Sequence, residues 1–307
     1  MNAPKGWYES VSMPRFGICI GCEGKIPYVS ARNTEKKLGG RSRSHRSSTY
    51  SVASWSRQLC ASCQSSISYI EQIGCPHCGR AVRCTDCERH PLFVHGLTAN
   101  RSAVAYSEEM KAWLHRFKFQ GDVGYAAIMA GMMLHRYELL AATIANFHQQ
   151  ISIAPLPLYE RLRRWLYQLP SVPYPDVVTF VPSTAERLVD RGFNPAERLA
   201  ELLAISWDCP VMPLLTRMTD QGRQSHLGRS GRELALAGTY RCHTEALQML
   251  CANTNKNTSN KSPMYILLVD DVYTTGSTIR ACAGALTGAL RNYGISAIIC
   301  SYTWARA

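Results

Sequence analysis

The chain contains no apolar run that approaches the ~20 residues required to cross a membrane as a helix. Its first residues, Met1 to Glu9, also lack the apolar core of a secretory signal. These two absences exclude a membrane-spanning segment and predict a cytoplasmic protein, in which thiols stay reduced. Acidic residues are scarce as well, with 22 Asp and Glu against 34 Lys and Arg, and the net charge of +12 favours an anionic partner.

The length of 307 residues and the hydrophobic content of 46% are typical of about two globular domains. Cysteines crowd into the first part of the chain, whereas the remainder has apolar segments that alternate between strand and helix patterns. We therefore predict a cysteine-rich region over residues 1–95 and a larger domain over 96–307. The larger domain carries a Pro- and Arg-bearing insertion near 152–176 and a polar one near 251–263.

Eight of the 13 cysteines form four Cys-x-x-Cys pairs, namely Cys19/Cys22, Cys60/Cys63, Cys75/Cys78 and Cys84/Cys87. In a reducing compartment this spacing favours zinc over disulfides, because each pair presents two thiolates and two pairs complete a tetrahedral site. Eight thiolates predict two structural Zn²⁺ ions in a zinc-ribbon region. Sequential pairing would give one site from the first four cysteines and one from the last four, and an interleaved pairing also satisfies the spacing.

A basic insertion separates the first two cysteine pairs, over about residues 23–59. Between Arg32 and Arg57 it holds seven Lys and Arg residues against the single acid Glu35, together with many serines. Such a segment is predicted to stay disordered until an acidic partner binds it. Single-stranded DNA is one candidate partner, and a solvated loop without a partner is the alternative.

Strands and helices alternate beyond residue 95, which predicts an α/β fold with a parallel, helix-covered sheet. A helix from Ser107 carries an apolar stripe at helical spacing, and a second helix over 126–137 completes a small cap or hood. Strands are predicted over 104–106, 176–182, 211–215, 265–269 and 295–303, a loop over 183–194, and further helices over 195–206 and up to 293.

The most informative segment runs from Tyr265 to Ile279, because an apolar strand leads into two carboxylates and then into a turn rich in hydroxyl groups. Asp270 and Asp271 at the strand end can accept hydrogen bonds from vicinal hydroxyls or hold a hydrated Mg²⁺ ion. The turn offers hydroxyls and backbone N–H groups at a helix N-terminus, which attract a phosphate. Its residues are Thr274, Thr275, Gly276, Ser277 and Thr278. A ribose 5-phosphate fits both parts, and an ordinary strand-turn-helix junction is the alternative.

This segment resembles the phosphoribosyl-pyrophosphate signature of the type I phosphoribosyltransferases. The resemblance implies that Asp270 and Asp271 hold the ribose hydroxyls, which makes them the candidate catalytic residues. It also implies that the loop from Thr274 to Thr278 wraps the 5-phosphate, that phosphoribosyl pyrophosphate binds with Mg²⁺, and that the domain has the parallel-sheet fold of that family.

A phosphoribosyl donor also carries a pyrophosphate group, which needs cations and backbone donors opposite the 5-phosphate loop. Arg191 and Gly192 are candidates, since a guanidinium offers bidentate donors and glycine lets the backbone approach. Arg187 and Arg217 are further candidates, and the segment 217–241 resembles the flexible loop that closes over the donor. For each arginine taken singly, a solvated surface position is the alternative.

Several motifs occur in the order in which the ComF family, the ComFC-type competence proteins of bacteria, carries them. They are the four cysteine pairs, His115-Arg-Phe-Lys-Phe119, Arg191-Gly-Phe-Asn194, Gln224-Ser-His-Leu227 with Arg232, and the terminal signature. The chain thus resembles this family over nearly its whole length. The resemblance implies a role in natural transformation and DNA uptake beside a competence helicase, with an unassigned acceptor. A single-stranded-DNA-binding adaptor with an idle or regulatory nucleotide site and a nucleotide-salvage phosphoribosyltransferase are the alternatives.

Overall fold

This computed structural model describes residues 17–26, 55–89, 91–119, 124–151, 174–218, 238–254 and 263–307. Most of the basic insertion and of the segments near 152–176, 217–241 and 251–263 lies outside the described residues, as do Gln224 to Leu227 and Arg232. The chain divides into two compact units, Met1–Ile67 and Ser68–Ala307, so that four of the paired cysteines belong to each.

In the first unit, a short turn around Cys19 and Cys22 is joined to a second stretch that begins at Trp55. The second stretch contains the 3-10 helix η2 (Ser56–Gln58) and the short helix α2 (Ala61–Ser65). The backbone N–H of Ile20 donates to the carbonyl oxygen of Gln58 at 3.0 Å, which ties the two stretches together. Cys60 is the N-cap of α2 and accepts from the N–H of Cys63.

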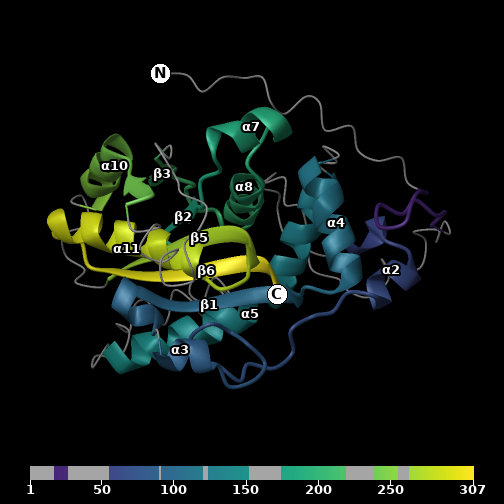
Figure 1. Ribbon diagram of the computed structural model, residues 1–307, viewed down its shortest axis with the longest axis horizontal. Coiled ribbons are helices and arrows are strands. Elements are labelled where there is room, and N and C mark those ends of the chain that lie inside the picture. Colours follow the sequence, from purple (N-terminus) through teal and green to yellow (C-terminus); the bar gives the residue numbers. More distant parts are fainter. Residues whose placement is uncertain are drawn as a thin grey trace, which may run out of the picture. The chain divides into compact units, whose positions relative to one another are not determined.

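The second unit is built on a four-stranded sheet in the order β1-β6-β5-β2, in which all pairs are parallel (Figure 1). The strands are β1 (Leu97–Ala105), β2 (Val177–Phe180), β5 (Met264–Tyr273) and β6 (Ala297–Arg306). The run from Ile266 to Val269 is fully buried, as expected for a parallel strand covered on both faces. The predicted α/β class with a parallel, helix-covered sheet is thereby confirmed.

One face of the sheet is covered by two helices, α5 (Gly124–Ile151) and α8 (Pro195–Trp207), which also pack on each other. The hydroxyl of Tyr302 in β6 donates to the carbonyl oxygen of Met133 in α5 at 2.6 Å. The predicted cap or hood over 126–137 is therefore wrong, because this helix is longer and its apolar side packs on the sheet. Among the described segments, no helix is both long enough and apolar enough to cross a membrane.

The opposite face is covered by α11 (Ser277–Asn292), whose buried side includes Ile279, Ala283 and Leu286. These residues share one core with the four cysteines from Cys75 to Cys87 and with the strand residues Ile266 and Leu268. Residues of five further elements contribute to the same core. These elements are α3 (Thr85–Arg89), the 3-10 helix η3 (Leu92–His95), α10 (Thr244–Thr254) and the antiparallel pair β3 (Leu215–Arg217) and β4 (Tyr240–Cys242).

Several element boundaries differ from the sequence prediction. β5 continues through both acidic residues to Tyr273, because β6 pairs with it as far as Arg306. The predicted loop 183–194 contains the helix α7 (Ala185–Arg191), which Thr184 caps by accepting from the N–H of Arg187. The strand predicted over 211–215 is instead β3, preceded by one bridge between Val211 and Val178.

Candidate functional site

The acidic pair Asp270 and Asp271 is held in the last part of β5, beyond the buried run that anchors the strand. Both residues are half-buried, and the side chain of Asp271 is 15% exposed. The backbone N–H of Asp271 donates to a carboxylate oxygen of Asp270 at 2.9 Å. Two adjacent carboxylates thus lie at the carboxyl end of a parallel strand, where such sheets present their ligands.

The electrostatic environment of the pair is set by burial and by the two like charges. Loss of hydration and the charge of Asp271 raise the pKa of Asp270, while the N–H of Asp271 and the ammonium of Lys118 oppose this rise. The pair is therefore costly to keep ionised in isolation, and a nearby cation reduces that cost.

Lys118 supplies such a cation, because its Nζ atom lies 2.6 Å from Oδ2 of Asp271. It belongs to α4 (Glu108–Phe119), in which Met110, Trp113, Leu114 and Phe117 form the predicted buried stripe. Phe117 also packs against Phe193, with ring centroids 5.2 Å apart. The stripe fixes the rotation of α4, and this rotation brings Lys118 to the acidic pair.

The turn after β5 depends on Gly276, which is buried and has φ of +75°. A Cβ atom at this position would overlap the phenol ring of Tyr273, so only glycine fits in this conformation. Gly276 is also the N-cap of α11 and provides no side-chain cap. The N–H of Ser277, the first of α11, donates to Oγ1 of Thr275 at 3.5 Å, and the hydroxyls of Thr275 and Ser277 lie 3.1 Å apart. Hydroxyl groups and backbone donors thus gather at the N-terminus of α11, a place that favours anions.

Two of the predicted arginines lie on different elements, Arg191 at the end of α7 and Arg217 at the end of β3. Arg191 ends α7 with Gly192 as its left-handed C-cap, and its guanidinium lies 4.8 Å from the ring centroid of Phe119. Burial and the neighbouring charge of Arg187 lower the pKa of Arg191, and the charge of Asp271 acts against this shift. Arg191 and Lys118 therefore both act electrostatically on Asp271.

Arg217 in β3 lies over the ring of Tyr240 in β4, at 5.6 Å from the ring centroid. Burial raises the pKa of Tyr240 to about 12, and the groups that act on it include Arg217, Asp270 and the side chain of Thr278. Tyr240 of the β3-β4 pair thus interacts with Asp270 and with Thr278 in the first turn of α11, and Arg217 interacts with Tyr240.

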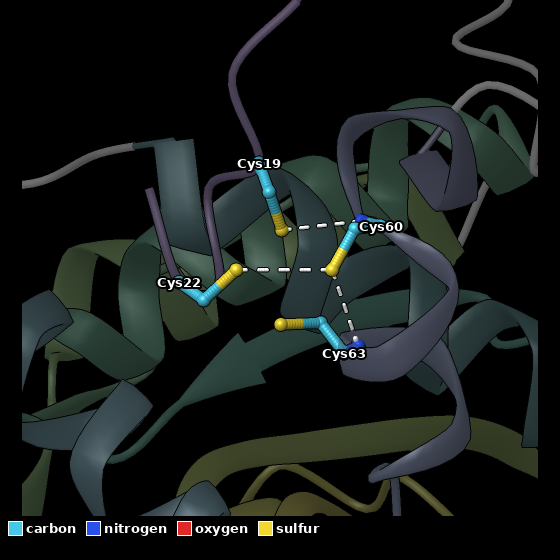
Figure 2. A group of neighbouring side chains, drawn as sticks. All are labelled: Cys19, Cys22, Cys60 and Cys63. Atoms are coloured by element: carbon cyan, nitrogen blue, oxygen red, sulfur yellow. Dashed lines mark hydrogen bonds between the residues drawn. The ribbon is translucent and has the colours of Figure 1, made fainter. Parts of the chain in front are cut away.

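The first cysteine group combines Cys19, Cys22, Cys60 and Cys63, and its four sulfur atoms lie within 4.8 Å of one another (Figure 2). The N–H of Cys60 donates to the sulfur of Cys19 at 3.1 Å, and the N–H of Cys63 donates to the sulfur of Cys60 at 3.5 Å. This last bond is the largest of the contacts that lower the pKa of Cys60 to about 7, and the other three cysteines of the group lower it as well. Backbone donors that favour thiolates suit a metal site.

The second group combines Cys75, Cys78, Cys84 and Cys87, which are all buried and also lie within 4.8 Å of one another. Both groups follow the sequential pairing, so the interleaved alternative is wrong. The chemistry of four converging sulfur atoms fits a tetrahedral zinc ion, and each group could hold one. Burial raises the pKa of Cys78, and the nearby charge of Arg306 opposes that rise.

No family model matches the chain. The competence protein ComFC of Bacillus subtilis, however, is 30% identical to it over 260 residues, which cover 81% of this chain and 85% of that protein. The chain belongs to the ComF family. ComFC of Streptococcus pneumoniae is 27% identical over 72% of this chain and 77% of its own length. The DNA utilization protein YhgH of Salmonella typhi is 25% identical over 76% of this chain and 91% of its own.

In this ComF-family chain, Asp271 interacts electrostatically with Arg191, and Tyr240 interacts with Asp270, Arg217 and the side chain of Thr278. The sequence analysis did not single out Lys118 and missed its ion pair with Asp271. It also missed Tyr240 and Arg306. The signal that could have identified Lys118 is the motif from His115 to Phe119, in which Lys118 stands between two phenylalanines.

Proposed function

We propose that this chain binds phosphoribosyl pyrophosphate with Mg²⁺ at the carboxyl end of β5. The observation that carries the proposal is the position of Asp270 and Asp271 at the end of β5, directly before the turn at Gly276 that begins α11. The carboxylates would accept from the two ribose hydroxyls, and the turn from Thr274 to Thr278 would donate to the 5-phosphate.

The pyrophosphate group would contact the cations near the acidic pair. Arg191 and Arg217 lie on different elements, and both act electrostatically on groups around the pair. Gly192 leaves space beside Arg191, because among the described residues nothing lies within 4 Å of the position that a Cβ atom would take there. Arg187 adds positive charge next to Arg191. Mg²⁺ would neutralise part of the pyrophosphate charge.

If a group is transferred, an acceptor nucleophile forms a bond to the anomeric carbon of ribose as the bond to pyrophosphate breaks. The residues around the turn would then position the sugar and stabilise the developing charges. The names of its relatives concern competence and DNA utilization, so we place this activity in DNA uptake. We also propose that each group of four cysteines holds one structural Zn²⁺ ion.

The test replaces Asp270 and Asp271 together by asparagine, which keeps their shape and removes their charge. Calorimetry with phosphoribosyl pyrophosphate and Mg²⁺ should show an affinity at least about tenfold lower, or ~1.4 kcal/mol. The matched control replaces the exposed Glu109 and Glu245 by glutamine, since this changes the net charge equally and should leave the affinity unchanged. Equal affinities of the two double variants would remove the proposal.

A further inference from the structure

Arg306, near the end of β6, connects the second cysteine group to the turn before α11. Its Nη1 atom donates to the carbonyl oxygen of Cys78 at 2.9 Å, and its guanidinium lies 4.6 Å from the ring centroid of Tyr273. Arg306 and Tyr273 are also paired in the β5-β6 register and are only 8% and 2% exposed. One buried side chain therefore contacts both the cysteine group and the residue that precedes the turn.

Tyr273 extends this connection to the backbone of the turn. Gly276 packs so closely on the phenol of Tyr273 that there is no room for a Cβ atom. Gly276 is the left-handed N-cap of α11, so its conformation sets the start of the helix whose first N–H groups would donate to the proposed phosphate. A displacement of Tyr273 would therefore move the backbone donors of the turn.

Buried positive charges beside the second cysteine group explain why the state of this group would affect Arg306. Arg101 is 4% exposed and donates to the carbonyl oxygens of Pro76 and Asn100. Together with Arg306, which donates to Cys78, it places two buried guanidinium groups beside these cysteines. Within the described part of the chain, no carboxylate forms an ion pair with either arginine. Buried charges require compensation, and a zinc ion with four thiolates would supply a net charge of about −2.

We propose that Arg306 is a positioning residue that couples the second cysteine group to the sugar-phosphate turn, so that the turn keeps its binding conformation while this group holds zinc. This inference rests on the proposed function of the turn. Loss of the metal would leave Arg306 as an uncompensated buried charge, and its reorientation would release Tyr273 and then Gly276. The first cysteine group belongs to the other unit and is not part of this connection.

The experiment uses the full-length chain with Cys60→Ser and Cys63→Ser as the reference, so that the remaining zinc belongs to the second group. In this background Arg306→Met should release zinc to a chromophoric chelator about 10 to 100 times faster, as found for groups that support metal ligands. When loaded with zinc, the variant should also bind phosphoribosyl pyrophosphate with Mg²⁺ about tenfold more weakly in calorimetry.

Arg101→Met is the matched control, because Arg101 contacts the same cysteine segment and, in contrast to Arg306, has no contact with Tyr273 among the described residues. We expect it to release zinc faster and to keep its affinity for phosphoribosyl pyrophosphate when zinc is loaded. Removal of zinc should weaken binding in the reference and add no further loss in Arg306→Met, since both changes break the same connection.

The outcomes separate the two proposals. If the reference binds phosphoribosyl pyrophosphate and Arg306→Met binds it equally well, the coupling is refuted while the proposed function stands. If the reference does not bind phosphoribosyl pyrophosphate at all, the proposed function fails. Independently of that result, an unchanged rate of zinc release in Arg306→Met would refute the role of Arg306. Should this variant not fold, Arg306→Lys applies the same test, because lysine keeps the charge and loses the planar stacking group.

Discussion

Substitution of Gly276 by alanine tests the local structure on which the candidate site depends. Two separate effects act at this position. Gly276 has φ of +75°, a conformation that costs other residues about 1–2 kcal/mol. The added Cβ atom would also overlap the phenol of Tyr273, which is buried and cannot move without disturbing Arg306. Overpacking of this kind costs about 1–3 kcal/mol.

Two glycines at the other end of α11 separate these effects. Gly294 has φ of +66°, and no described residue lies within 4 Å of its Cβ position, so Gly294→Ala should lose only the conformational part, about 1–2 kcal/mol. Gly288 lies inside α11 with equally open surroundings, and Gly288→Ala should stabilise the helix by about 0.5–1 kcal/mol. Gly276→Ala should lose about 2–5 kcal/mol, the sum of both effects.

The free energies of unfolding are measured by urea denaturation, followed by circular dichroism, and the affinity for phosphoribosyl pyrophosphate with Mg²⁺ is measured by calorimetry. Only Gly276→Ala should lose affinity by about tenfold or more, because the other two glycines lie away from the turn. The reasoning is refuted if Gly276→Ala and Gly294→Ala are equally stable, or if all three variants bind equally well.

Two further predictions concern charges. Lys118→Gln removes the cation beside Asp271, and both side chains of this ion pair are mostly buried. The free energy of unfolding, measured by urea denaturation, should therefore fall by about 1–3 kcal/mol. Lys111→Gln, whose partner Glu108 is exposed, should have a much smaller effect, and equal effects would contradict the importance of the Lys118 pair. In the basic insertion, replacing three arginines by alanine should flatten the dependence of single-stranded DNA affinity on salt by about two units, without changing affinity for phosphoribosyl pyrophosphate. The three are Arg41, Arg43 and Arg46. An unchanged salt dependence in filter binding would leave the insertion as a solvated loop.

The sequence by itself determined the features that depend on residues close together in the chain. The two-residue spacing within each cysteine pair identified the members of both cysteine groups. The apolar run before Asp270 predicted a buried strand, and the stripe of α4 predicted its buried side, as the structure confirms. These patterns are readable because a strand or a helix turn sets the direction of neighbouring side chains locally.

Only the tertiary structure decided which distant residues meet. Lys118 and Asp271 are brought together by the packing of α4, and Arg306 meets Cys78 because β6 ends beside the cysteine segment. The sequential grouping of the cysteines was likewise settled by chain contacts, since both pairings have the same local spacing. The strand β5 ends at Tyr273 and not at Val269 as predicted, because pairing with β6 extends it across two acidic residues that strands disfavour by local propensity. Such contacts depend on how elements pack, and local spacing carries no information about them.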